Sequence, residues 1–175
     1  MNASRANRIV ILLAMLVSCV GCDQVTKTIA TRELAAQPEP HEFLGGIFSL
    51  HFARNPGAFL GMGGDLPGPV RFWTMTVFNA LAMGAIGIVL WKKWNMAPAK
   101  FVAGALILGG GIGNLIDRVS YGGLVTDFLH LRLGPLQTGI FNVADVAITL
   151  GCALLVVVFW RDDRAAKLNQ ASRGA

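Results

Sequence analysis

Four long apolar segments constrain the fold of this chain more than any other feature of its sequence. They lie at about residues 9–29, 72–91, 98–118 and 141–160. The first covers 21 residues, or roughly 31 Å as a helix, which is enough to cross a bilayer. Apolar residues make up 54% of the chain and charged residues only 14%, which excludes an ordinary soluble domain. We therefore predict an all-α membrane protein with four transmembrane helices, folded as one domain over residues 1–175.

The first apolar segment has two interpretations. Arg5 and Arg8 precede an apolar run that contains LVSC at residues 16–19. A positive start, a short apolar run and such a tetrapeptide are typical of a cleaved lipoprotein signal peptide. The same residues also suit an uncleaved membrane helix. We favour the helix because three further spans follow it.

The positive charges predict how the chain is oriented in the membrane. Cytoplasmic segments carry an excess of Lys and Arg, so both termini and the tail, residues 161–175, are expected in the cytoplasm. Loops 31–70 and 119–140 then face outward. The net charge of +5 does not indicate a nucleic-acid partner, because the cations sit at the ends of apolar spans and form no basic face. Nine of the fifteen Lys and Arg residues lie on the cytoplasmic side: Arg5, Arg8, Lys92, Lys93, Lys100, Arg161, Arg164, Lys167 and Arg173.

The first outer loop, residues 31–70, is polar and contains several prolines. Its run IFSLHF at residues 47–52 has the composition of a β-strand, with apolar side chains on both faces. We expect a small periplasmic, β-containing platform in this loop, which lies on the membrane surface or lines a groove. Asn55, followed by Pro56 and Gly57, predicts a turn.

Three acidic residues near the third and fourth spans form the candidate site: Asp117, Asp127 and Asp145. A carboxylate beside a bilayer is costly unless it is paired, hydrated or protonated, so such residues indicate function. The predicted topology places all three at the outer interface. If Asp127 folds against Asp145, the two like charges compete, and one carboxyl keeps its proton while the other stays ionised. Such a pair can deprotonate a water and polarise a carbonyl, which is the chemistry of peptide hydrolysis without a metal or a nucleophilic side chain.

The polar residues beside these acids also have structural interpretations. Asn142 suits the N-cap of the fourth helix, where the helix dipole favours a negative Asp145. Asn114, Asp117 and Arg118 occupy one helical turn. We interpret Asp117 as structural and paired with Arg118, although Arg118 could instead reach a phosphate or a carbonyl.

Asp23 and Lys27 stand four residues apart near the outer end of the first span. This spacing puts both on one helix face and predicts an ion pair that makes the two charges tolerable there. The pair could also brace the outer site. For the whole group of polar residues, the simpler alternative is an interfacial hydrogen-bond network that keeps water out of the helix bundle.

Other functional classes fit the sequence less well. His41 and His51 have no partner at metal-ligand spacing, so neither a metal nor another cofactor is expected. The glycines at 109–113 lack the strand before, the helix after and the lysine of a phosphate-binding loop. A small channel or transporter would place ionisable groups near the bilayer midplane, on broken helices. Spans 72–91 and 141–160 are uninterrupted and carry no midplane charge, which favours a peptidase.

Five short motifs, in this order along the chain, resemble those of the lipoprotein signal peptidases of bacteria, the type II signal peptidases. They are DQVTK at 23–27, NPGAF at 55–59, GNLIDR at 113–118, VTDF at 125–128 and FNVAD at 141–145. The sequence departs from the family pattern at Thr126, where a second valine is common, and at Pro56, Gly57 and Leu60. These departures remove no catalytic group.

The resemblance implies a role for each matching residue. The catalytic pair corresponds to Asp127 and Asp145, and not to Asp117. The residues that bind substrate or support the active site correspond to Asn55, Asn114, Arg118 and Asn142, and the motif of the first helix to Asp23 and Lys27.

The resemblance also implies an activity. Such an enzyme removes the signal peptide of prolipoproteins by cutting just before a cysteine that carries diacylglycerol. The expected partners are these prolipoproteins and membrane lipids, and we expect a monomer without cofactor. The expected location is the bacterial inner membrane, with the active site at the outer, periplasmic leaflet.

Overall fold

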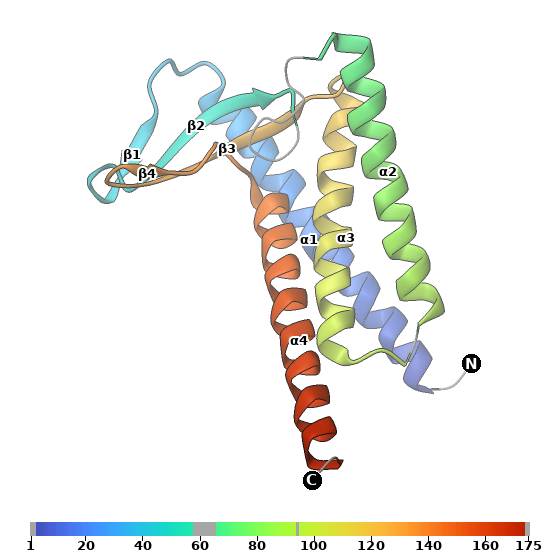
Figure 1. The fold of residues 1–175 in the computed structure, drawn as a ribbon. Helices are drawn as coiled ribbons and strands as arrows, with labels where there is room; N and C mark the ends of the chain where they lie inside the picture. The colour runs from blue at the N-terminus through green and yellow to red at the C-terminus, as the bar shows by residue number, and fades with distance from the viewer. Residues whose placement is uncertain (1–2, 58–65, 94, 174–175) are drawn as a thin grey trace.

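The computed structural model describes residues 3–57, 66–93 and 95–173. The strands form two groups along the chain, one after the first long helix and one after the third (Figure 1). The elements are α1 (Ala3–Leu34), β1 (His41–Phe43), the 3₁₀ turn η1 (Leu44–Gly46), β2 (Phe48–Asn55), α2 (Gly68–Lys92), α3 (Pro98–Ser120), β3 (Val125–Leu133), β4 (Leu136–Gln137) and α4 (Val143–Arg173).

Four helices in the described part of the chain are long and apolar enough to cross a membrane, which confirms the four predicted spans. Each observed helix reaches beyond the predicted apolar segment. α1 has 32 residues, and α4 continues through the charged residues of the tail as far as Arg173. Proline near the first position starts α2 and α3, because its fixed φ suits a first turn whose N–H groups have no helical partner. Length and apolar composition therefore identified the spans but not their ends.

The helix α3 is the centre of the bundle. It contacts α1, α2 and α4, and half of its most apolar stretch is buried, whereas the other three helices mostly face outward. The glycines at 109–113 allow this close packing. A Cβ atom on any of them would collide with a neighbouring helix: on Gly109 with Cys19, on Gly110 with Ala144, on Gly111 with Met83 and on Gly113 with Asp23.

A four-stranded antiparallel sheet extends sideways from one end of the bundle, while the first residues of α1 and the last of α4 lie toward the other end (Figure 1). The strand order is β1-β2-β3-β4. The expected platform in the first outer loop is thus only half of the sheet, because β3 and β4 come from the second loop. We did not predict β3, although the alternation of apolar and polar residues in LHLRL at 129–133 is typical of a strand.

The sheet is held to the bundle at the middle of β3, through Phe128 and Leu129. Phe128 is buried with Ala30 and Leu34, near the end of α1. Phe141 returns along β3 and exchanges two backbone hydrogen bonds with Leu129 before α4 begins. Asp127 therefore lies on a strand and not in an irregular loop, and the start of α4 is brought beside it.

Candidate active site

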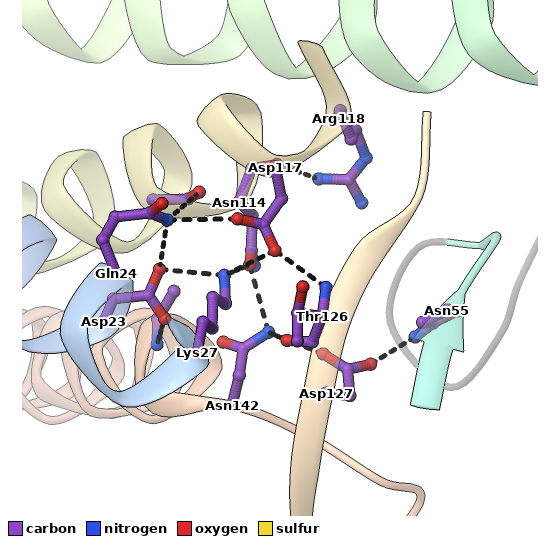
Figure 2. A network of polar contacts seen from close by, with 12 residues as sticks. Asp23, Gln24, Lys27, Asn55, Asn114, Asp117, Arg118, Thr126, Asp127 and Asn142 are labelled. Carbon is purple, nitrogen blue, oxygen red and sulfur yellow. Dashed lines mark hydrogen bonds and ion pairs between the residues drawn. The ribbon is translucent and has the colours of Figure 1, made fainter. Parts of the chain in front are cut away.

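The carboxyl group of Asp127 is buried, with 1% of the residue exposed, where β3 meets the bundle. Its two oxygens accept different amides: Asn55 Nδ2 donates to Oδ2 over 2.8 Å, and Asn142 Nδ2 donates to Oδ1 over 2.6 Å. These contacts come from β2 and from the residue before α4, as Figure 2 shows. Three segments distant in sequence therefore meet at this carboxyl.

Asp145 occupies the first turn of α4 and is only half-buried. Its backbone N–H donates to Asn142 Oδ1 over 3.0 Å, and its own Oδ2 accepts the backbone N–H of Asn142 over 3.2 Å. This reciprocal pair caps the helix, as the sequence predicted for Asn142. Asn114 Nδ2 donates to Asp145 Oδ1 over 2.8 Å, so α3 holds the same carboxyl from the other side.

Two asparagines connect the two acids. Asn142 contacts both: its side-chain amide donates to Asp127 and its backbone N–H donates to Asp145. Asn142 Nδ2 also lies 3.1 Å from Asn114 Oδ1, and Asn114 in turn donates to Asp145. The structure thus brings Asp127 and Asp145 into one hydrogen-bonded network through residues that the sequence had singled out.

A buried cation supports this network from α1. Lys27 Nζ lies 2.8 Å from Asp23 Oδ2, which confirms the predicted ion pair, and it donates to Asn114 Oδ1 over 3.0 Å. Because an ammonium group only donates, it turns the carbonyl of Asn114 toward α1 and leaves the Nδ2 group facing Asp145. Asp23 Oδ1 accepts the backbone N–H of Ala144 over 2.9 Å, which ties α1 to the start of α4.

Asp117 does not form the expected ion pair with Arg118 among the described residues. Its Oδ2 lies 3.4 Å from Lys27 Nζ and accepts the backbone N–H of Thr126 over 2.7 Å. Its Oδ1 accepts Gln24 Nε2 over 3.1 Å. The physical reason is that neighbouring residues on a helix point about 100° apart, so adjacency in sequence does not make two side chains face each other.

The guanidinium of Arg118 is buried and has weak partners. Nη1 donates to the carbonyl of Asn114 and Nη2 to the carbonyl of Gly57, both over 3.3 Å, and Nε has no hydrogen-bond partner in the described part of the chain. The side chain lies on the side of the network nearest Asn55 and β2 in Figure 2. A buried guanidinium whose N–H groups have few partners is suited to donate hydrogen bonds to a carbonyl or an anionic oxygen.

Asn55 combines two roles that the sequence left open. Its Oδ1 accepts the backbone N–H of Gly57 over 2.9 Å, which is the predicted turn. Its Nδ2 meanwhile holds Asp127. The turn therefore fixes the amide so that its donor side faces the acid.

Burial and the charge of Asp145 raise the pKa of Asp127. Four carboxyl groups meet two cations here: Asp23, Asp117, Asp127 and Asp145 with Lys27 and Arg118. Burial raises the pKa of Asp127 to about 6, and the charge of Asp145 acts in the same direction, whereas the amides of Asn55 and Asn142 lower it. A carboxyl with such a pKa exchanges its proton near neutral pH.

Sequence reasoning missed three residues of this network. Gln24 joins Asp23, Asp117 and the carbonyl of Gly113, and its presence in an apolar span was the available signal. Thr126 had been noted only as a departure from the family pattern, and Arg54 had no assigned role. No group of three His, Cys, Asp or Glu side chains in the described residues is placed to hold a metal ion.

Residues 15–161 match the protein family described as signal peptidase (SPase) II, which covers most of the chain. The chain belongs to this family. The lipoprotein signal peptidase of Sphingopyxis alaskensis is 39% identical over 135 residues, covering 77% of this chain and 76% of that protein. The lipoprotein signal peptidase of Chlorobium phaeovibrioides is 36% identical over 155 residues, covering 84% and 88%.

Solved structures of bacterial membrane enzymes share the fold of this chain. A structure described as a bacterial membrane enzyme superposes with a TM-score of 0.76 at 27% identity, covering 89% of this chain and 90% of the other. A second, with the same description, gives a TM-score of 0.73 at 28% identity, covering 88% and 95%. With its four apolar helices, this signal peptidase II family member is a multi-pass inner-membrane protease.

Proposed function

We propose that the chain is an aspartic endopeptidase that removes the signal peptide from diacylglyceryl-modified prolipoproteins. The cut falls just before the lipidated cysteine, and Asp127 and Asp145 activate the attacking water. The observation that carries this proposal is the pairing of a buried Asp127, whose pKa is raised to about 6, with a half-buried Asp145 in one amide network.

The two environments support different roles for the two acids. Asp127 is buried, and its raised pKa lets it hold the shared proton. Asp145 accepts the N–H of Asn142 and the amide of Asn114 at the N-terminus of α4, where donors and the helix dipole stabilise a negative charge. Asp145 is therefore the general base and Asp127 the acid.

The steps balance in protons and electrons. Asp145 takes a proton from water as the water oxygen bonds to the scissile carbonyl carbon, and the Asp127 proton stabilises the developing oxyanion. When the tetrahedral intermediate collapses, the C–N bond breaks and Asp145 returns its proton to the leaving amine. We assign Arg118, whose Nε has no partner among the described residues, to donate to a substrate carbonyl near the reacting bond.

The position of the site suits this substrate. Asp127 lies on β3 and Asp145 in the first turn of α4, and Figure 1 shows that these two elements join at one end of the bundle. Both acids therefore belong at a membrane–water interface when the four helices span the bilayer. A cysteine that carries diacylglycerol places the bond before it at the depth of the lipid headgroups. The predicted orientation makes this the outer, periplasmic leaflet.

Replacing either acid by its amide tests the proposal. Asp127→Asn and Asp145→Asn keep the size of each side chain but remove the proton exchange, and we expect each to lower cleavage of a lipidated prolipoprotein in detergent by about 10⁴-fold or more. Arg132→Met, on an exposed part of β3, is the control and should cleave normally. Near-normal turnover by either amide variant, purified in its folded form, would exclude the acid pair.

A further inference from the structure

Arg54 is a half-buried cation on β2, directly before Asn55, and the proposed chemistry gives it no role. Its Nη1 donates to Thr126 Oγ1 over 2.7 Å. Its guanidinium carbon lies 3.7 Å from the ring centroid of Tyr121 and 5.2 Å from that of Phe52. A planar guanidinium held by a hydrogen bond and stacked on an aromatic ring is fixed in position, unlike a typical surface arginine.

The hydrogen-bond partner of Arg54 stands next to the proposed acid. Thr126 is 1% exposed, and all of its polar groups are engaged: the N–H donates to Asp117, the carbonyl accepts Asn142, and the hydroxyl accepts Arg54. Asp127 follows immediately in the chain. Arg54 therefore holds Thr126, the residue directly before Asp127 on β3.

The local pairing of the strands explains why such a contact is needed. A register shift between Leu50 and Ala53 interrupts the β2–β3 ladder. Beyond the shift only three pairs remain before β2 ends, and they place Ala53, Arg54 and Asn55 opposite Asp127, Thr126 and Val125. A ladder that is both short and terminal opens easily. The hydrogen bond from Asn55 to Asp127 depends on this short ladder staying closed.

Tyr121 extends the contact to a third element. It follows α3 directly and donates its backbone N–H to the carbonyl of Asp117. The side chain of Arg54 thus joins β2, β3 and the end of α3. Each of these elements carries a residue of the proposed site, namely Asn55, Asp127 and Asn114.

We propose that Arg54 is a positioning residue of the peptidase, which closes the last pairs of the β2–β3 ladder through Thr126 and Tyr121 and so keeps Asn55 bonded to Asp127. This inference rests on the proposed function. Arg54 touches no reacting atom in it; its effect on catalysis passes through Asn55.

The first experiment compares matched variants of the full-length enzyme in detergent, with a lipidated prolipoprotein as substrate. Arg54→Met should lower kcat by about tenfold with little change in KM, since it removes an interaction that shapes the transition state and not substrate binding. Thr126→Val and Tyr121→Leu should each reproduce part of this loss. Arg132→Met, the exposed arginine of β3, should be unaffected.

Two further readouts separate positioning from mere stabilisation. Combining Arg54→Met with Thr126→Val should cost little more than the worse single change, because both break one contact. The high-pH limb of the kcat profile should move upward in Arg54→Met, since a displaced Asn55 no longer favours the ionised form of Asp127. The charged groups that face Asp127 from the packed elements are Lys27 of α1, Arg118 of α3 and Asp145 of α4.

The outcomes that overturn the inference are distinct from those that overturn the proposed function. A lower melting temperature of Arg54→Met with unchanged kcat and pH profile, or additive effects in the double variant, would exclude the positioning role. If Arg54→Met does not fold, Arg54→Lys and Thr126→Val decide by the same measurements. Retained activity in Asp127→Asn would exclude the proposed chemistry itself, whatever Arg54 does.

Discussion

At the scale of single residues, the contrast between Asp127 and Asp145 is set by their surroundings and not by their chemistry. Both are carboxyl groups that accept amide donors, but only Asp127 is buried on a strand between the bundle and the sheet. Asp127 is buried whereas Asp145 is half-exposed, and this difference is what the proposed function uses to give the two acids different roles.

Burial raises the pKa of Asp127, and the amide of Asn55 opposes this effect. Its N–H stabilises the ionised carboxylate, so removing it should raise the pKa of Asp127 above its value of about 6. If the singly protonated pair is the active form, activity falls as pH rises through this pKa. We therefore expect the high-pH limb of the kcat profile to move up by about one unit in Asn55→Ala.

The pH profile of cleavage by purified variants is the measurement for this prediction. Asn95→Ala, in the turn between α2 and α3, is the control and should keep the wild-type profile. If the high-pH limb of the kcat profile stays at the wild-type pH or moves to lower pH in Asn55→Ala, Asp127 is not the acid that holds the shared proton.

The buried Asp127 also makes stability depend on pH. Because its pKa rises from 3.8 to about 6 on folding, the folded state holds the proton more tightly than the unfolded state. The resulting stabilisation is fully present below about pH 4 and is lost as pH rises through about 6, with a limit of about 3 kcal/mol. Because the amide in Asp127→Asn does not titrate, this variant should not lose that stability as pH rises.

The difference in melting temperature between wild type and Asp127→Asn isolates that contribution from other titrating groups. It should shift in favour of the variant between pH 4 and 7, by several degrees, when followed by thermal unfolding in detergent. A difference in melting temperature that does not change with pH would show that the pKa of Asp127 is not raised in the folded protein.

At the scale of elements, α3 positions the site because its small residues let other helices approach. The Cβ atom of an alanine at position 113 would lie 2.5 Å from Asp23 Oδ2, and Asp23 cannot move without losing Lys27 and the N–H of Ala144. Close packing of α1 and α3 thus keeps the polar network at hydrogen-bonding distance.

Gly113→Ala should therefore destabilise the protein by about 1–3 kcal/mol and lower its activity, since overpacking displaces the network. Gly87→Ala, on α2, is the matched control because its Cβ would meet open space. Thermal unfolding and cleavage assays on both variants measure the effect. Equal behaviour of the two would mean that α1 and α3 do not pack as the structure shows.

At the scale of the whole molecule, the site lies toward one end of the bundle and the ends of α1 and α4 toward the other (Figure 1). The excess of Lys and Arg near those ends predicts that they face the cytoplasm.

A fluorescent protein fused after residue 175 should then fluoresce in cells, and alkaline phosphatase fused there should be inactive. Alkaline phosphatase inserted at Gly134, between β3 and β4, should be active. The reverse pattern would place the site in the cytoplasm.

The sequence by itself determined the four spans, the order of the motifs and the identity of most polar residues in the site. Long apolar runs and helix caps are local properties, so Asn142 with Asp145 and Asp23 with Lys27 could be paired from spacing alone. Half of the sheet was missed, because β3 gains its pairing from β2, a segment about 80 residues away in the chain.

The resemblance had named Asp127 and Asp145 as the pair, but only the tertiary structure shows how the three acids are connected. Asp117 and Arg118 are neighbours in sequence, but helical geometry turns Asp117 toward Lys27 and the N–H of Thr126. Asp127 and Asp145 enter one hydrogen-bonded network because β3 pairs with β2, the chain returns at Phe141, and the glycines of α3 admit α4. Each of these contacts joins distant segments, and burial at their meeting point is what raises the pKa of Asp127.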